Sequence, residues 1–316
     1  MVYGYLVRIV VYKLVTVVYY DLFPFKWVSA MAVKYLRFGL LCLALALSWV
    51  ADASDEVSKD GKITVAVASN FLSTMKQLVH IYQQDTGRVV LLSGGSTGKH
   101  YAQIIHGAPF DVFFAADAIR PKLLEDKHIG VKGSRFTYAE GSLVIWSPEI
   151  LKSKTHDSIS LDHKALAALL ASRDIKTLAM ANPKLAPYGK ATQDVINALS
   201  PEGLLSRGNH KMRVIQGENI SQTFQFVMSG TADLAFLAHS QVLDRNITGI
   251  QKERYKVISE HYRVIPNALH QPIRQQAIRL NNKELTRLFV KFIKGPVAKS
   301  IIESNGYNIV GVTDAG

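Results

Sequence analysis

Cysteine is almost absent from this chain of 316 residues, and the single one, Cys42, lies inside an apolar run near the N-terminus. If that run is removed as a signal, the remaining chain has no cysteine. Such a chain can form no disulfide and has no thiolate to act as a nucleophile or to bind a metal ion. Cysteine chemistry is therefore excluded for the processed chain.

The sequence also lacks complete motifs for nucleotide, metal and nucleophilic chemistry. Gly94–Lys99 is close to a phosphate-binding P-loop, but Ser93 replaces the first glycine and His100 replaces the hydroxyl residue that would hold Mg²⁺. The ten histidines show no metal-ligand spacing. Ser69 or Ser96 as a nucleophile would need a histidine base and an orienting carboxylate, which nothing nearby supplies. We therefore expect no enzyme activity, cofactor or metal, and a serine hydrolase is the alternative.

Acidic residues are the minority among the charges. The chain has 37 Lys and Arg against 25 Asp and Glu, a net charge of +12. Residues 1–53 hold five basic and two acidic residues, so the rest of the chain carries 32 against 23, or +9. This balance favours anionic partners. No stretch combines dense Lys and Arg with aromatic residues, so nucleic acid is not the expected partner.

The first 53 residues are expected to be an extension followed by a secretory signal. The apolar run Phe38–Val50 follows two basic residues and is shorter than the about 20 residues of a transmembrane helix. Ala51-Asp52-Ala53 then fits an A-x-A cleavage site. Met31 to Ala53 is therefore predicted to be the signal, which implies a periplasmic chain. We expect Met31 to be the true initiator, and a membrane segment within residues 1–30 is the alternative.

From residue 62 onward, apolar runs alternate with amphipathic stretches. Lys62–Ala68 predicts a strand, and Phe71–Tyr82 has apolar residues at helical spacing. Val89–Leu92 predicts the next strand, Thr97–Ile105 a helix and Asp111–Ala116 a buried strand. Strands that alternate with helices predict an α/β fold with mostly parallel sheets.

A second set of alternating elements begins after Ser147-Pro148. An apolar strand at 141–146 is predicted before that point. The predicted members of the second set are a helix at 166–170, strands at 177–180, 212–215 and 233–237, and helices after Tyr188 and Asn219. The last part of the chain predicts extended segments at 255–258 and 273–280 and helices at 284–293 and 297–304. The length suits two domains.

Small polar residues stand where two of the first helices are expected to begin. Ser69 and Asn70 follow the first strand, and Thr97 ends the glycine-rich loop after the second. A helix start carries unpaired N–H groups and a partial positive charge, so two such starts can bind an anion without a charged side chain. The alternative is that Asn70 and Thr97 are only N-caps.

The second half has a similar pair of turns. Asn182–Gly189 follows a strand, and its two prolines fix the path of the loop. In Gly217–Ile220, Asn219 can cap the next helix and Ile220 can offer its N–H. Each could also be an ordinary connecting turn. Because ligands of open α/β sheets bind at the carboxyl ends of the strands, the four turns predict one shared site.

These segments together resemble the periplasmic molybdate-binding proteins of ABC transporters. The motifs that carry the resemblance occur in order between residues 60 and 310: 68–71, the Gly-Ser-Thr-Gly loop, 107–117, 182–189, 218–220 and 272–277. The resemblance implies two α/β lobes, each a mostly parallel sheet flanked by helices, joined by crossing strands. It places residues 54–141 and 239–316 in lobe 1 and residues 142–238 in lobe 2.

The resemblance also implies the ligand, the site and the partner. The ligand would be molybdate, or the nearly isosteric tungstate, held by Ser69, Asn70 and Thr97 from one lobe and by Tyr188 and Ile220 from the other. A membrane permease of an ABC transporter would receive it from a monomeric receptor. Where some members have a ligand-binding tyrosine this chain has Ala238, and Tyr188 is expected to replace that contact.

The expected site binds its ligand through hydrogen-bond donors alone. A tetrahedral dianion at neutral pH has no proton to give, so N–H groups, hydroxyls and the Asn70 amide would bind it without a buried opposite charge. Sulfate has the same charge and shape, and only the size of the site would exclude it. A receptor for sulfate or another tetrahedral oxyanion is therefore the second alternative.

Overall fold

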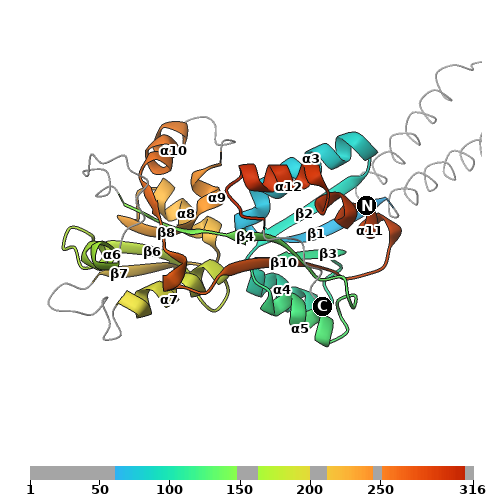
Figure 1. The fold of residues 1–316 in the computed structure, drawn as a ribbon, viewed down its shortest axis with the longest axis horizontal. Helices are drawn as coiled ribbons and strands as arrows, with labels where there is room; N and C mark the ends of the chain where they lie inside the picture. The colour runs from blue at the N-terminus through green and yellow to red at the C-terminus, as the bar shows by residue number, and fades with distance from the viewer. Residues whose placement is uncertain (1–60, 148–162, 200–211, 245–250, 310–316) are drawn as a thin grey trace, which may run out of the picture. The chain divides into compact units, whose positions relative to one another are not determined.

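A computed structural model describes residues 61–147, 163–199, 212–244 and 251–309. The predicted extension and signal at 1–53 lie outside these ranges. The described residues form two five-stranded sheets, and the order of strands is β2-β1-β3-β10-β4 in the first and β7-β6-β8-β5-β9 in the second (Figure 1). In each sheet one strand, β10 or β5, is antiparallel to its neighbours. The predicted two-lobed α/β fold with mostly parallel sheets is confirmed.

The first sheet is covered by helices on both faces. Its strands are β1 (Lys62–Ala68), β2 (Val89–Gly95), β3 (Val112–Ala115), β4 (Phe136–Gly141) and β10 (Ile273–Arg279). On one face lie α3 (Leu72–Thr86), α11 (Glu284–Ile293) and α12 (Pro296–Ser304), and on the other lie α4 (Thr97–Ile105) and α5 (Ile119–Asp126) (Figure 1). Because both faces are buried, β1 is apolar on both: Val65 faces the α3 side and Ala66 the α4 side.

The second sheet follows the same plan. Its strands are β5 (Leu143–Trp146), β6 (Thr177–Ala181), β7 (Arg213–Gly217), β8 (Leu234–Ala238) and β9 (Tyr262–Val264). One apolar core includes side chains of α6 (His163–Leu170) and α7 (Pro187–Leu199), and another includes side chains of α8 (Ile220–Met228), α9 (His239–Val242) and α10 (Gln251–Glu260).

Two crossings of the chain join the sheets. Only Ser142 separates β4 of the first sheet from β5 of the second, and the chain returns between β9 and β10 (Figure 1). The predicted boundary placed residues 239–316 with the first lobe, but Tyr262–Val264 pairs with β5 in the second sheet. The chain rejoins the first sheet only at Ile273.

One predicted extended segment, Tyr255–Ile258, is wrong, because it lies inside α10. Tyr255 and Ile258 contact the same apolar core, and Val257 between them is 42% exposed. Tyr255 and Ile258 are three residues apart and face the same core, as expected for a helix. The sequence Tyr-Lys-Val-Ile also fits the apolar and polar alternation of a strand, so the sequence alone did not distinguish the two.

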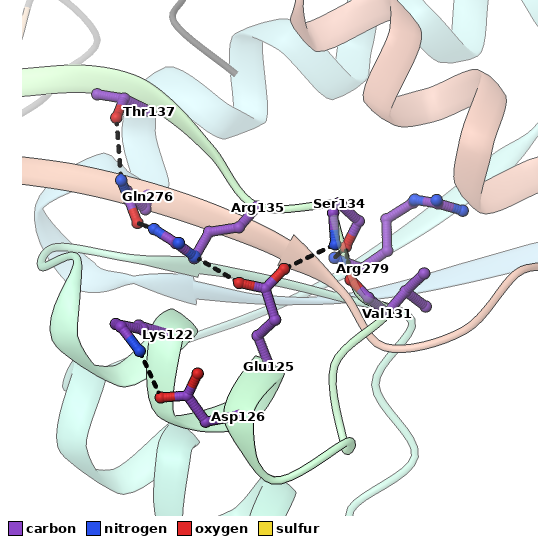
Figure 2. A network of polar contacts seen from close by, with 10 residues as sticks. Lys122, Glu125, Asp126, Val131, Ser134, Arg135, Thr137, Gln276 and Arg279 are labelled. Atoms are coloured by element: carbon purple, nitrogen blue, oxygen red, sulfur yellow. Dashed lines mark hydrogen bonds and ion pairs between the residues drawn. The ribbon is translucent and has the colours of Figure 1, made fainter. Parts of the chain in front are cut away.

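A partly buried polar network fixes β10 beside β4 (Figure 2). The Gln276 amide accepts from Arg135 at 2.9 Å and donates to Thr137 Oγ1 at 3.1 Å, and Arg135 Nε donates to Glu125 at 2.9 Å. Burial raises the pKa of Glu125, but the hydrogen bonds from Arg135 and from the Gly133 N–H outweigh it, so the net pKa is lowered. The carboxylate therefore stays charged and holds Arg135 against β10.

Candidate ligand-binding site

Thr97 opens α4, and Ser96 is its N-cap. The Ser96 Oγ accepts from the Lys99 N–H at 3.4 Å, so the predicted alternative that Thr97 is the cap is wrong. Thr97 is only 1% exposed, and its Oγ1 accepts from the Ala116 N–H at 3.1 Å. A hydroxyl that accepts through its oxygen still has a proton to donate, so Thr97 is a candidate donor.

Ser69 and Asn70 form the short 3₁₀ turn η1 (Ser69–Phe71) between β1 and α3. Asn70 is not a side-chain cap: its Nδ2 donates to Gln275 Oε1 at 2.9 Å and to Tyr307 Oη at 3.1 Å. The sequence predicts that this amide donates to an anion, but both of its hydrogens have acceptors within the protein. The Asn70 side chain therefore links the turn η1 to β10 and to Tyr307.

The second lobe contributes two helix starts. Tyr188 is the second residue of α7, after Pro187, and its side chain is fully buried. Asn219 caps α8, as predicted, because its Oδ1 accepts from the Gln222 N–H at 3.0 Å. Ile220 is then the first residue of α8 and is buried. The first N–H groups of a helix have no partner within the helix, so Ile220 can present its own.

Three contacts bring the turns of the two lobes together. The Gly98 N–H donates to the Leu185 carbonyl at 2.9 Å, which joins the start of α4 to the loop before α7. The Ser221 hydroxyl donates to the carbonyl of Ser69 at 3.1 Å, which joins α8 to η1. Lys99 and Glu218 form an ion pair at 2.5 Å across the same boundary.

All five predicted residues lie along this boundary. Ser69 contacts the residue after Ile220, Asn70 is linked to Tyr188 through Gln275, and Thr97 precedes the glycine that contacts the loop before α7. Tyr188, Ile220 and Ala116, which donates to Thr97, also belong to one apolar cluster. The four turns that the sequence predicted to meet therefore do meet.

Comparisons with known proteins fit this arrangement. Residues 63–308 match the family model described as bacterial extracellular solute-binding protein. The chain is 38% identical over 252 residues to the molybdate-binding protein ModA of Azotobacter vinelandii, covering 78% of this chain and 90% of that protein. This chain belongs to the bacterial extracellular solute-binding proteins.

Two further proteins, both named as molybdate-binding, are similar to this chain. The chain is 33% identical over 275 residues to ModA of Rhodobacter capsulatus, covering 86% of this chain and 96% of the relative. The solved structure of the periplasmic molybdate-binding protein of Azotobacter vinelandii matches 79% of this chain and all of its own, with a TM-score of 0.65 and 34% identity.

The boundary between the lobes of this solute-binding protein carries neutral donors. Burial raises the pKa of Tyr188 and of Tyr138 well above the usual tyrosine value, and the neighbouring Tyr307 raises both further. The pKa of Tyr307 is also raised, again mainly by burial. The three phenols therefore keep their protons throughout the physiological pH range and remain hydrogen-bond donors.

Sequence reasoning missed Gln275, Tyr138 and Tyr307 in this solute-binding protein. Gln275 lies inside the motif at 272–277, and a glutamine in an otherwise apolar strand is a signal that could have been used. Tyr138 and Tyr307 lack such a signal, because their roles arise from contacts with residues 137 and 237 positions away in sequence.

The serines of the predicted hydrolase alternative have no catalytic partners in the described part of the chain. Ser96 Oγ caps α4, and Ser69 has no hydrogen bond to a histidine. Ser93 Oγ does lie 3.4 Å from His100 Nε2, but burial lowers the pKa of His100 to about 4 and its Nδ1 has no partner. That histidine is a weak base without an orienting carboxylate.

Two kinds of feature are absent from the described residues of this solute-binding protein. Within these ranges, no group of three His, Cys, Asp or Glu side chains is placed to hold a metal ion. Nor does any described helix have the length and apolar character needed to cross a membrane.

Proposed function

We propose that this solute-binding protein is a periplasmic receptor that binds molybdate, and also tungstate, between its two lobes. It delivers the anion to the membrane permease of an ABC transporter and acts as a monomer without a cofactor and without catalytic activity. Ser69, Asn70, Thr97, Tyr188 and Ile220 bind the oxyanion. The signal at Met31 to Ala53 directs the chain to the periplasm.

One observation carries the proposal: helix starts and neutral hydroxyls from both lobes meet at one boundary. Thr97 begins α4, Ile220 begins α8 and Tyr188 lies in the first turn of α7, so three helix N-termini contribute. Such N-termini stabilise a negative charge through their N–H groups and dipoles. The similarity to two named molybdate-binding proteins supports molybdate as the anion.

Tyr188 replaces the tyrosine that some family members carry at the position of Ala238. Ala238 ends β8, pairs with Leu143 and is fully buried, so its methyl group offers no donor. The Tyr188 hydroxyl lies near the neighbouring crossing strand, where a Cβ atom added to Gly141 would be 2.1 Å from it. This location supports Tyr188 as the second-lobe hydroxyl donor.

Calorimetric titration of the purified processed chain with molybdate, tungstate and sulfate tests the function. We expect molybdate and tungstate to bind with a stoichiometry of one per chain and sulfate to bind far more weakly. Elemental analysis of protein that has been dialysed against mixed oxyanions gives an independent check. Preferential binding of sulfate would support the oxyanion alternative, and retention of neither molybdenum nor tungsten would contradict the proposal.

A further inference from the structure

We propose that Gln275 is a positioning residue for anion binding, because its side-chain amide makes the Tyr188 oxygen an acceptor and so directs the Tyr188 proton toward the bound oxyanion. The inference rests on the proposed function, since it concerns a donor of the same site. Gln275 itself is not proposed to touch the ligand.

The direction of each hydrogen bond in this network, from donor to acceptor, can be assigned by starting at a backbone carbonyl, which can only accept. Tyr307 Oη lies 2.8 Å from the carbonyl oxygen of Asn70, and two oxygens that close need a proton between them. The Tyr307 proton is therefore used on this carbonyl, to which the Ser240 hydroxyl also donates at 3.3 Å. The Tyr307 oxygen must then accept from the Asn70 side chain, which presents its nitrogen at 3.1 Å.

The orientation of the Asn70 amide in turn determines which end of the Gln275 amide donates. The Asn70 nitrogen lies 2.9 Å from one end of the Gln275 amide, which must be the oxygen. Tyr138 Oη lies 2.9 Å from the same oxygen and shares its proton between this oxygen and the Ala115 carbonyl at 3.1 Å. The other end is therefore the NH₂ group, which donates to Tyr188 Oη at 3.4 Å. A phenol has one proton. The hydrogen bonds of Tyr188 with Gln275 and with the Asn70 side chain both lower its pKa, as donors to its oxygen do, so neither side chain takes that proton.

The chain positions Gln275 firmly for this task. Its side chain is 0% exposed, and the pairing register of β10 with β4 shifts between Gln275 and Gln276. The adjacent Gln276 is fixed by Arg135 and Thr137 (Figure 2). A Cβ atom on Gly141 would lie 2.7 Å from Gln275 Nε2, so glycine at this position leaves room for the amide to reach Tyr188.

A glutamate at position 275 would reverse the direction of the hydrogen bond with Tyr188 while keeping the shape of the side chain. Its ionised carboxylate only accepts, so Tyr188 would donate to the glutamate and lose its role as an anion donor. The same carboxylate would also repel the ligand, and a buried carboxyl group beside an anion takes up a proton readily. Binding of molybdate to Gln275→Glu is therefore expected to be coupled to proton uptake.

The first test compares Gln275→Glu with the unaltered chain by calorimetry at pH 8. We expect an affinity loss of about 100-fold for Gln275→Glu. Titrations in two buffers with different ionisation enthalpies should show uptake of about one proton on binding to this variant and none for the unaltered chain. Gln271→Glu, an exposed position in the same crossing segment, is the control for added charge.

The second test is a double-mutant cycle with the neutral variant Gln275→Met. Alone it should weaken binding by about tenfold, and in a Tyr188→Phe background it should cost little, because no phenol remains to be oriented. Equal losses in both backgrounds, or Gln275→Glu binding as tightly as the unaltered chain without proton uptake, would overturn the role of Gln275. Failure of the unaltered chain to bind would instead overturn the proposed function. If Gln275→Met does not fold, the proton uptake of Gln275→Glu decides.

Discussion

The backbone N–H of Gly98 donates to the carbonyl of Leu185 over 2.9 Å, so the first turn of α4 in one lobe touches the loop before α7 in the other. A Cβ atom added to Gly98 would lie 3.0 Å from the Leu185 oxygen and 3.1 Å from its Cα. Both atoms belong to the backbone and cannot rotate away as a side chain can. A glycine is therefore needed here for the two lobes to approach so closely.

Gly98→Ala should weaken molybdate binding by about tenfold, or about 1.4 kcal/mol, because the lobes must separate by a few tenths of an ångström. The free energy of unfolding should change by less than about 1 kcal/mol, since alanine favours a helix more than glycine does. Calorimetry and urea denaturation measure the two effects. Gln103→Ala, on the exposed face of the same helix, is the matched control. Unchanged affinity would mean that this approach does not matter for binding.

Reversing the charge of Lys99 should weaken binding slightly and in a salt-dependent way. Lys99 and Glu218 pair across the lobes, but their side chains are 53% and 39% exposed. An exposed pair contributes about 0.2–1 kcal/mol, and salt screens it. Lys99→Glu should therefore raise the Kd a few-fold at low salt, and Lys99→Glu with Glu218→Lys should restore most of the loss. No recovery in the double variant would rule out a specific pair.

Thr97→Val should weaken binding more than it weakens the fold. Valine keeps the shape of threonine but removes both the acceptor for the Ala116 N–H and the proposed donor to the anion. We expect about 1–3 kcal/mol less binding free energy and about 1 kcal/mol less unfolding free energy. Thr97→Ser, which keeps the hydroxyl, is the control. Similar losses in binding and stability for Thr97→Val would indicate a structural role only.

The fold should lose stability in acid because of His100. Burial lowers its pKa from 6.5 to about 4, so between these values the unfolded chain binds a proton that the folded chain does not. This contribution is complete above about pH 6.5 and is lost as the pH falls toward 4, a change of about 3 kcal/mol. Urea denaturation at several pH values measures it. His100→Leu should flatten the slope and the exposed His106→Gln should not; an unchanged slope in His100→Leu would contradict the assignment.

Local patterns were enough to predict most of the elements. The sequence predicted the bounds of the strand Lys62–Ala68 and of the helix Thr97–Ile105. An apolar run and a helical repeat can each be recognised from a few consecutive residues. β9 at Tyr262–Val264 was missed because it is short and none of its residues is fully buried, so it lacks a strong pattern. Its place in the second sheet depends on pairing with β5, more than a hundred residues earlier.

The candidate site was predictable in outline and not in its internal contacts. Four polar turns after strands indicated where the lobes would meet, because topology places the ends of parallel strands at one edge. The role of the Asn70 side chain could not be inferred in the same way. Its amide bonds to Gln275 and Tyr307, which are 205 and 237 residues away in sequence, and only the folded chain brings these groups within reach.

The two crossings have a consequence for how the chain is made. The described residues between β5 and β9 form one continuous insertion, whereas the first sheet is assembled from both ends of the sequence. β10 lies between β3 and β4, so β4 has no neighbour in that sheet until residues 273–279 have been synthesised. The second lobe can fold as soon as it emerges, but the first lobe must wait for the C-terminal part of the chain. A chain built in this order keeps its first lobe open until residues 273–279 have been added, while its second lobe is already closed.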